Sequence, residues 1–217
     1  MVAQAAIQRH VAFGYAKAAA VLGAPVQQIR PTAAMLPLQQ PTHATLTAFF
    51  DQDAAFGMKK PWSRRTAGGS EGFAALDTTD VLPGDILVGV DTYFVTRFEP
   101  IRPCQVILTN TLFDVLASSS VIAPDPSGYR GRTRAQDTPI ATGWPGNKRA
   151  GGRSEIDPAK LPSDSKAASW TILLPPIPGV TIVRETMLRD GDGQLYQVAA
   201  ANLEPFGWTL IAVEIVV

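Results

Sequence analysis

The stretch "PGDILVGVDTYFVTRFEP" (Pro83–Pro100) decides the predicted fold of this chain of 217 residues. A Gly/Asp turn leads into the pair Tyr93 and Val95, and apolar and polar residues alternate around it, which is typical of a β-hairpin. A similar stretch, "RDGDGQLYQVAAANLEP", returns about a hundred residues later at Arg189–Pro205, and both stretches end in Glu-Pro. The repetition predicts two related β units. Two unrelated hairpins would also share these residues, because hairpins favour Gly, Asp, Tyr and Val.

Runs with a period of two predict further short strands around both stretches. The segment "RPCQVILTNTLFDVLAS" holds one or two of them. The other expected strands are Asp85–Val88, Thr92–Phe98, Trp170–Leu174, Thr181–Val183, Met187–Arg189, Leu195–Ala201 and Thr209–Val217. The predicted fold class is therefore mainly β, with two small antiparallel β modules of barrel or sandwich type, a short N-terminal α-helix and long irregular loops.

The N-terminal segment "IQRHVAFGYAKAAAVLG" predicts the helix, because its apolar residues recur at helical spacing and Gly23 and Pro25 follow as stop signals. The apolar stripe is narrow and rich in alanine. Such a helix gains little stability by itself and needs a surface close by, either in its own domain or on a neighbouring subunit.

Four parts of the chain follow from these patterns. Residues 1–79 are expected to form the helix and an extended arm, because four prolines between 25 and 41 oppose a continuous helix or a central strand. Residues 80–122 are the first β module. Residues 123–168 show no apolar periodicity and are expected to form a long irregular loop with a role in function or assembly. Residues 169–217 are the second β module, packed with the first.

Composition excludes several classes of protein. The net charge is zero, 46% of the residues are hydrophobic and only 18% are charged, which predicts a folded protein without a global attraction to nucleic acid or to an anionic membrane. The sequence has no apolar run long enough to cross a membrane and no secretory leader, so we expect synthesis in the cytoplasm and no membrane partner. A single cysteine excludes an internal disulfide framework.

The sequence offers little chemistry. His10 and His43 lack a metal-binding partner at a suitable spacing, and Cys104 lies in a strand-like run typical of a buried, inert thiol. Asp190–Gly193 resembles the start of a calcium loop but lacks the closing glutamate, so a tight hairpin turn is the better interpretation. No Gly-x-Ser-x-Gly elbow, phosphate loop or dinucleotide motif occurs. We therefore predict no catalytic, cofactor-binding or metal-binding residues, and no enzyme.

The irregular loop carries local basic character instead, interleaved with aromatic residues. This pattern favours a solvated loop, or one that pairs with an acidic patch on a neighbouring subunit, over the alternative of a nucleic-acid-facing arm. The candidate interface residues are Arg130, Arg132, Arg134, Trp144, Lys148, Arg149 and Arg153.

Four stretches, in this order, resemble a family of structural proteins from the virions of tailed bacteriophages and prophages. They are "GYAKAAAVLGAPVQQIRPT", "GDILVGVDTYFVTRFEPIRPCQVI", "TPIATGWPGN" and "SWTILLPPIPGVTIVRETMLRDGDGQLYQVAAANLEPFGWTLIAVE". The resemblance spans nearly the whole chain. The motifs are short, so their order and spacing carry the specificity. Similar proteins tend to have Cys-Asn where this chain has Cys104-Gln105.

The resemblance implies a non-enzymatic virion subunit that assembles as a ring of copies in the head-to-tail connector (neck) or the tail. The implied partners are other copies, portal or adaptor, tail-tube, tail-terminator or baseplate proteins, with non-specific contact to packaged DNA as a further option. A baseplate or tail-tip component is an alternative. Another is a carbohydrate- or receptor-binding module in which Trp144, Trp170 and Trp208 offer stacking surfaces, although Trp170 and Trp208 fit a core position better.

Overall fold

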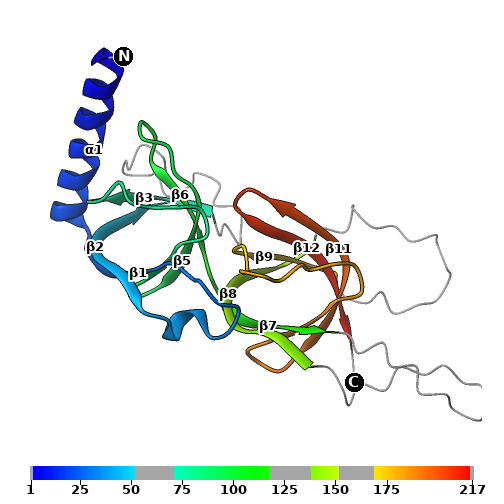
Figure 1. Ribbon diagram of the computed structural model, residues 1–217. Coiled ribbons are helices and arrows are strands. Elements are labelled where there is room, and N and C mark those ends of the chain that lie inside the picture. Colours follow the sequence, from blue (N-terminus) through cyan, green and yellow to red (C-terminus); the bar gives the residue numbers. More distant parts are fainter. Residues whose placement is uncertain (1, 52–70, 118–137, 152–168, 216–217) are drawn as a thin grey trace, which may run out of the picture.

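The computed structural model describes residues 2–51, 71–117, 138–151 and 169–215, which form a helix and two closed β-barrels (Figure 1). The first barrel, barrel 1, has six antiparallel strands in the order β1-β2-β3-β6-β5-β4, and β4 pairs with β1 to close it. Its strands are β1 (Ala24–Ile29), β2 (Thr42–Asp51), β3 (Glu71–Leu76), β4 (Ile86–Val88), β5 (Thr92–Arg97) and β6 (Cys104–Leu108). A short 3-10 helix, η1 (Pro37–Gln39), lies between β1 and β2.

The second barrel, barrel 2, repeats this topology six strands later. Its order is β7-β8-β9-β12-β11-β10, and β10 pairs with β7. Its strands are β7 (Thr111–Ala117), β8 (Thr138–Ala150), β9 (Ser169–Leu174), β10 (Met187–Asp190), β11 (Leu195–Glu204) and β12 (Gly207–Ile215). The predicted mainly β fold with two antiparallel modules is confirmed.

The two stretches that suggested a repeat occupy equivalent places in the two barrels. Tyr93 in β5 pairs with Leu87 in β4, and Tyr196 in β11 pairs with Leu188 in β10. Each second strand then shifts register directly after the valine of its Tyr-x-Val motif. A β-bulge at the same position bends both strands into their barrels.

The turns that enter the two hairpins are also equivalent. Leu82–Asp85 precedes β4 and Val183–Thr186 precedes β10. In each, the backbone N–H of the fourth residue donates to the carbonyl of the first at 3.1 Å. The side chain of the fourth residue accepts the N–H of the first, at 2.9 Å in barrel 1 and 3.1 Å in barrel 2. The third residue is left-handed in both, with φ of 92° at Gly84 and 71° at Glu185.

The predicted division of the chain is wrong at three places. The segment before residue 80 is not an extended arm beside the fold, because β1, β2 and β3 supply half of barrel 1. β7 belongs to barrel 2 and not to the first module. The predicted loop 123–168 contains β8, whereas residues 118–137 and 152–168 lie outside the described residues. In addition, Thr181–Val183 forms no strand, because Val183 opens the turn before β10.

The sequence did not predict β8, because close packing against neighbouring strands, and not strand propensity, determines which residues it contains. The strand contains Pro139, Pro145 and Gly146, which alternation patterns assign to loops. A Cβ atom on Gly146 would lie 2.5 Å from the Leu174 side chain and 2.8 Å from the Phe113 side chain. Glycine is therefore required where β8 lies closest to its neighbours.

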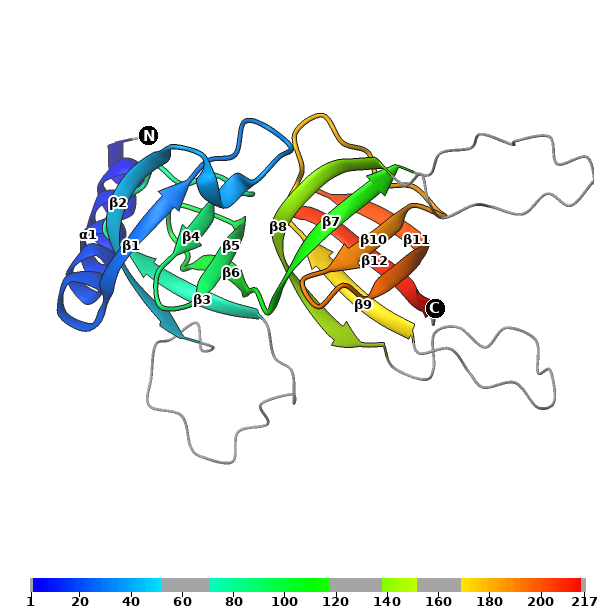
Figure 2. The ribbon, with the colours of Figure 1, turned by 90° about the horizontal axis from the view of Figure 1, so that it is seen from below.

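The N-terminal helix is confirmed as α1 (Val2–Leu22). It contacts β2 and β3 on the side of barrel 1 that faces away from barrel 2, and its N-terminal end extends beyond the barrel (Figures 1 and 2). Ala19 is fully buried there, and a Cβ on Gly23 would lie 2.6 Å from the Ala48 carbonyl oxygen of β2. Small residues thus allow a close approach between the helix and β2. Among the described residues, no helix is both long and apolar enough to cross a membrane.

The two barrels share buried contacts. Ile29 and Ile86 of barrel 1 belong to the same apolar cluster as the core of barrel 2. The Trp144 Nε1–H donates to the Ala34 carbonyl at 2.6 Å, and the Asn147 side-chain amide donates to the Leu108 carbonyl at 2.8 Å. These contacts join the barrels side by side, as Figure 2 shows.

Candidate functional site

The predicted interface residues do not form one surface. Arg130, Arg132, Arg134 and Arg153 lie outside the described residues. Trp144 is fully buried and its indole is hydrogen-bonded, so its prediction as a contact residue for a partner is wrong. Its local sequence, "TGWPGN", suggests a loop, but the stretch lies within β8, which places the indole in the core.

Lys148 lies near the end of β8, and its ammonium group is held by two side chains from the hairpin of β10 and β11. Nζ donates to Asp190 Oδ2 at 2.6 Å and to Tyr196 Oη at 2.9 Å, and the tyrosine hydroxyl donates to the same carboxylate at 2.9 Å. Nζ also lies 5.1 Å from the centre of the Trp170 ring. The Lys148 ammonium group is therefore paired within its own barrel, and its side chain is only 19% exposed.

The pKa values in this cluster follow from burial and hydrogen bonding together. Burial by itself would raise the pKa of Asp190, but the hydrogen bonds from Lys148 and Tyr196 outweigh it and hold the pKa below its usual value. Burial would lower the pKa of Lys148, yet its bonds to Asp190 and Tyr196 hold that pKa above its usual value. Burial raises the pKa of the Tyr196 hydroxyl. All three groups keep their neutral-pH charge state, which suits a structural cluster and not a general acid or base.

Asp190 also organises the hairpin turn. Its Oδ1 accepts the backbone N–H groups of Asp192 at 3.1 Å and Gln194 at 2.9 Å. The prediction of a tight turn at Asp190–Gly193 is confirmed. In the described part of the chain, no group of three or more His, Cys, Asp or Glu side chains is placed to bind a metal ion.

Arg149 follows Lys148 and is half-exposed. Its Nη1 lies 4.0 Å from Glu71 Oε1 of barrel 1. The pair adds a weak electrostatic contact between the barrels, because both side chains remain in water.

A second polar cluster closes one end of barrel 1, where Arg30 forms a two-point ion pair with the buried Asp85. Its Nε and Nη2 each lie 2.9 Å from one carboxylate oxygen. Gln28 donates to Asp85 Oδ2 at 2.7 Å, and Asp80 contacts Arg30 at 3.1 Å and His43 at 2.9 Å. The hydrogen bonds from His43 and Arg30 lower the pKa of Asp80. Every charged group here has a partner, so the cluster fixes the turn before β4.

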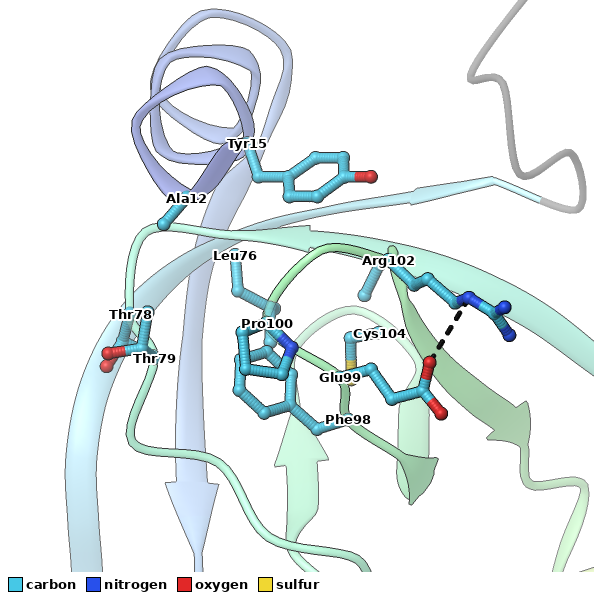
Figure 3. A pocket seen from close by; sticks show the side chains of 11 residues that line it. Ala12, Tyr15, Leu76, Thr78, Thr79, Phe98, Glu99, Pro100, Arg102 and Cys104 are labelled. Atoms are coloured by element: carbon cyan, nitrogen blue, oxygen red, sulfur yellow. Dashed lines mark ion pairs between the residues drawn. The ribbon is translucent and has the colours of Figure 1, made fainter. Parts of the chain in front are cut away.

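A small pocket lies between α1 and barrel 1 (Figure 3). Ala12 and Tyr15 of α1 line one side, and Phe98, Glu99 and Cys104 line the other. Its volume of about 20 Å³ holds little more than one water molecule, far below that of a ligand site. Burial raises the pKa of the Cys104 thiol to about 12, so the thiol is protonated and unreactive at neutral pH.

The side of α1 that faces away from barrel 1 was only partly predicted from the sequence. Ile7, Phe13 and Val21 are 60%, 68% and 73% exposed. Together with the exposed side chains of Arg9, His10 and Lys17 they form what we call the outer face of α1. The alanine-rich stripe indicated that the helix needs a surface to lie against, but it did not indicate that large apolar residues remain exposed after docking.

Comparisons of the chain with protein-family models, curated proteins and solved structures found no match. The function must therefore be inferred from the residues of this chain itself.

Proposed function

We propose that this protein is a non-enzymatic structural subunit that assembles with copies of itself into a ring, in the neck or tail of a tailed-bacteriophage virion. The observation that carries the proposal is the outer face of α1. Three large apolar side chains stay exposed there, on a helix that is already docked to its own barrel. Exposed apolar surface of this kind is typical of a protein–protein interface.

The architecture supports the same role. Both barrels are closed, so neither leaves an unpaired strand edge for uncontrolled aggregation. Shared core residues and two partly buried hydrogen bonds hold the barrels together. A rigid body with one projecting helix is suited to repeated, directional contacts between subunits.

The described tryptophans weigh against the carbohydrate-binding alternative. Trp144 and Trp208 are buried, and the Trp170 Nε1–H donates to Glu214 at 3.0 Å in a partly buried contact. Stacking on a sugar requires an exposed ring face, which two of these residues lack. A baseplate or tail-tip position fits the same assembly chemistry and remains the second candidate.

Two measurements on the full-length protein test the proposal. Sedimentation velocity over a range of protein concentrations should show reversible growth to one closed species, and negative-stain electron microscopy should show rings. Quantitative mass spectrometry of purified phage particles should find the chain at a fixed copy number. A protein that stays monomeric at every concentration and is absent from particles would contradict the proposal.

A further inference from the structure

We propose that the outer face of α1 binds barrel 1 of a second copy of this chain, so that each subunit of the ring grips the next through its helix. The proposal rests on the ring assembly proposed above and names the two surfaces that meet. The inner side of α1 is already occupied by the chain's own barrel, where Ala19 is fully buried. The outer face consequently points away from its own barrel, and no other part of the described residues covers its large apolar side chains.

Charge favours barrel 1 as the partner surface. The first fifty residues contain no Asp or Glu, and α1 carries the cations Arg9 and Lys17. The described residues of barrel 1, 24–51 and 71–108, carry seven carboxylates and three arginines. The carboxylates are Asp51, Glu71, Asp77, Asp80, Asp85, Asp91 and Glu99, of which Asp85 is buried against Arg30 and the other six are at least partly exposed. The positive charges of α1 are attracted to this excess of carboxylates in the described part of barrel 1, which steers encounter. The like charges of two α1 helices disfavour helix-to-helix pairing.

The helix end adds to this positive charge. The unpaired backbone N–H groups of the first turn carry partial positive charge, and no acidic side chain in that turn of α1 neutralises it. This end of α1 extends beyond its own barrel (Figure 1). The projecting turns can therefore reach a carboxylate-rich surface on another molecule.

Apolar groups occur on both surfaces. Phe13 stands near the middle of the outer face, with Ile7 and Val21 on either side along the helix. On barrel 1, Val90 is fully exposed at the tip of the β4–β5 turn, and its neighbour Asp91 is exposed as well. Leu82 and Ile101 of barrel 1 are also more than half exposed. Burial of an aromatic anchor among apolar groups and charges of opposite sign is typical of an interface hot spot.

Such a contact is heterologous, because the helix of one copy meets the barrel of another. Heterologous contacts generate closed rings when the rotation between subunits closes. A symmetric contact between the outer faces of two α1 helices would be isologous and would stop at a dimer. The proposed pairing therefore connects the exposed helix directly to the ring.

Photocrosslinking maps the contact. A benzophenone amino acid replaces Phe13 in the full-length protein, and equal amounts of isotopically light and heavy chains are mixed before irradiation. We expect light–heavy crosslinks from position 13 to peptides of barrel 1. The same probe at Leu203, an exposed position of β11 in barrel 2, serves as the control and should give none to barrel 1.

Charge reversal measures the contribution of the helix. Lys17→Glu should weaken self-association at least tenfold in the dissociation constant by sedimentation, and Asp91→Lys should do the same from the other surface. Arg184→Glu changes the charge by the same amount at an exposed loop of barrel 2 and should leave association within twofold. Far-UV circular dichroism checks that each variant is folded, and protection of the Cys104 thiol from a disulfide reagent checks that α1 is docked.

The outcomes separate the two proposals. This inference would be overturned if rings form but position 13 crosslinks to regions other than barrel 1, and if Lys17→Glu leaves the dissociation constant unchanged. The proposed ring function would be unaffected by that result. Absence of any self-association would overturn both. Binding of the wild-type helix to anionic lipid vesicles in place of a second copy would also overturn it.

Discussion

The turns before β4 and β10 have the same hydrogen bonds but different residues at the left-handed position. Barrel 1 uses Gly84, which reaches a φ of 92° without a steric penalty, and barrel 2 uses Glu185 at 71°. A side chain is tolerated in barrel 2 because the turn is exposed there. In barrel 1 the Gly84 backbone lies against Pro176 of barrel 2, which leaves no room for one. The contact with the second barrel therefore selects the glycine.

Gly84→Ala should lower the free energy of unfolding by about 2–4 kcal/mol, the sum of a left-handed alanine and an overpacked contact. An added Cβ would lie 2.7 Å from Pro176 Cγ. Gly193→Ala is the matched control, because Gly193 also has a positive φ of 83° but no atom within 4 Å of the added Cβ. It should cost only about 1 kcal/mol. Equal losses in urea unfolding would show that the Pro176 contact is unimportant.

Lys148→Met should destabilise the protein by about 3 kcal/mol, because it leaves the buried Asp190 carboxylate without its cation. Arg189→Met provides the control within the same barrel. Arg189 pairs with Asp114 at 2.7 Å, but it is half-exposed, so its loss should cost less than about 1 kcal/mol. Urea unfolding at pH 7 measures both variants, and a similar cost for the two would mean that burial does not strengthen the Lys148 pair.

The effect of Lys148→Met should depend on pH in a direction set by the pKa shifts. The folded pKa of Asp190 lies below its usual value, so the stabilisation from its charge is present above about pH 4 and is lost as the pH falls through the folded pKa. The pKa of Lys148 is raised, so its part is lost only at strongly alkaline pH. The difference in unfolding free energy between wild type and variant should therefore narrow below about pH 4. A constant difference from pH 3 to 7 would contradict this assignment.

At the scale of the elements, hairpins could be predicted from the sequence and the strands that close the barrels could not. β4, β5, β10 and β11 alternate regularly and flank Gly/Asp turns, so local patterns suffice for them. β1 begins with Ala24 and Pro25, and β8 contains two prolines, so only their pairing within a closed barrel defines them as strands. Local propensity carries no information about such pairing.

The same limit applies to the candidate site. Lys148 was identified as a basic residue of a loop, but its partners Asp190 and Tyr196 lie 42 and 48 residues away in sequence. β7 pairs with both β8 and β10, and β10 pairs with β11, which brings the three residues together. The outer face of α1 can be predicted in part from the sequence, because helical periodicity places its residues on one side of the helix. Which side of the helix the barrel covers is decided by Ala19 and Gly23.

The docking of α1 predicts a specific response of Cys104. Ala19→Leu should push the helix away from β2, since Ala19 is fully buried and a larger side chain would overpack the contact. Cys104 lines the pocket beneath α1, so the thiol should react with a disulfide reagent at least tenfold faster. Ala20→Leu changes the neighbouring exposed position and should leave the rate unchanged. Equal rates in both variants would mean that α1 does not protect this thiol.

At the scale of the whole molecule, the barrels are coupled by contacts that neither makes by itself. Ile29 and Ile86 complete the core around barrel 2, and the Ala34 carbonyl accepts the Trp144 indole N–H. Phe94 and Ile107 of barrel 1 also pack with Leu173 of barrel 2. Unfolding of one barrel would expose apolar surface of the other, which makes independent unfolding unfavourable.

This coupling predicts a single unfolding transition. In a Trp62→Phe background the remaining tryptophans all lie in barrel 2, so their fluorescence reports on that barrel, while Cys104 labelling reports on barrel 1. Both signals should have the same urea midpoint when the interface between the barrels is unchanged. Trp144→Phe deletes the indole donor to Ala34 and leaves a void, so the fluorescence midpoint should fall below the labelling midpoint. Separate midpoints in the protein without the Trp144→Phe substitution would mean that the two barrels unfold independently.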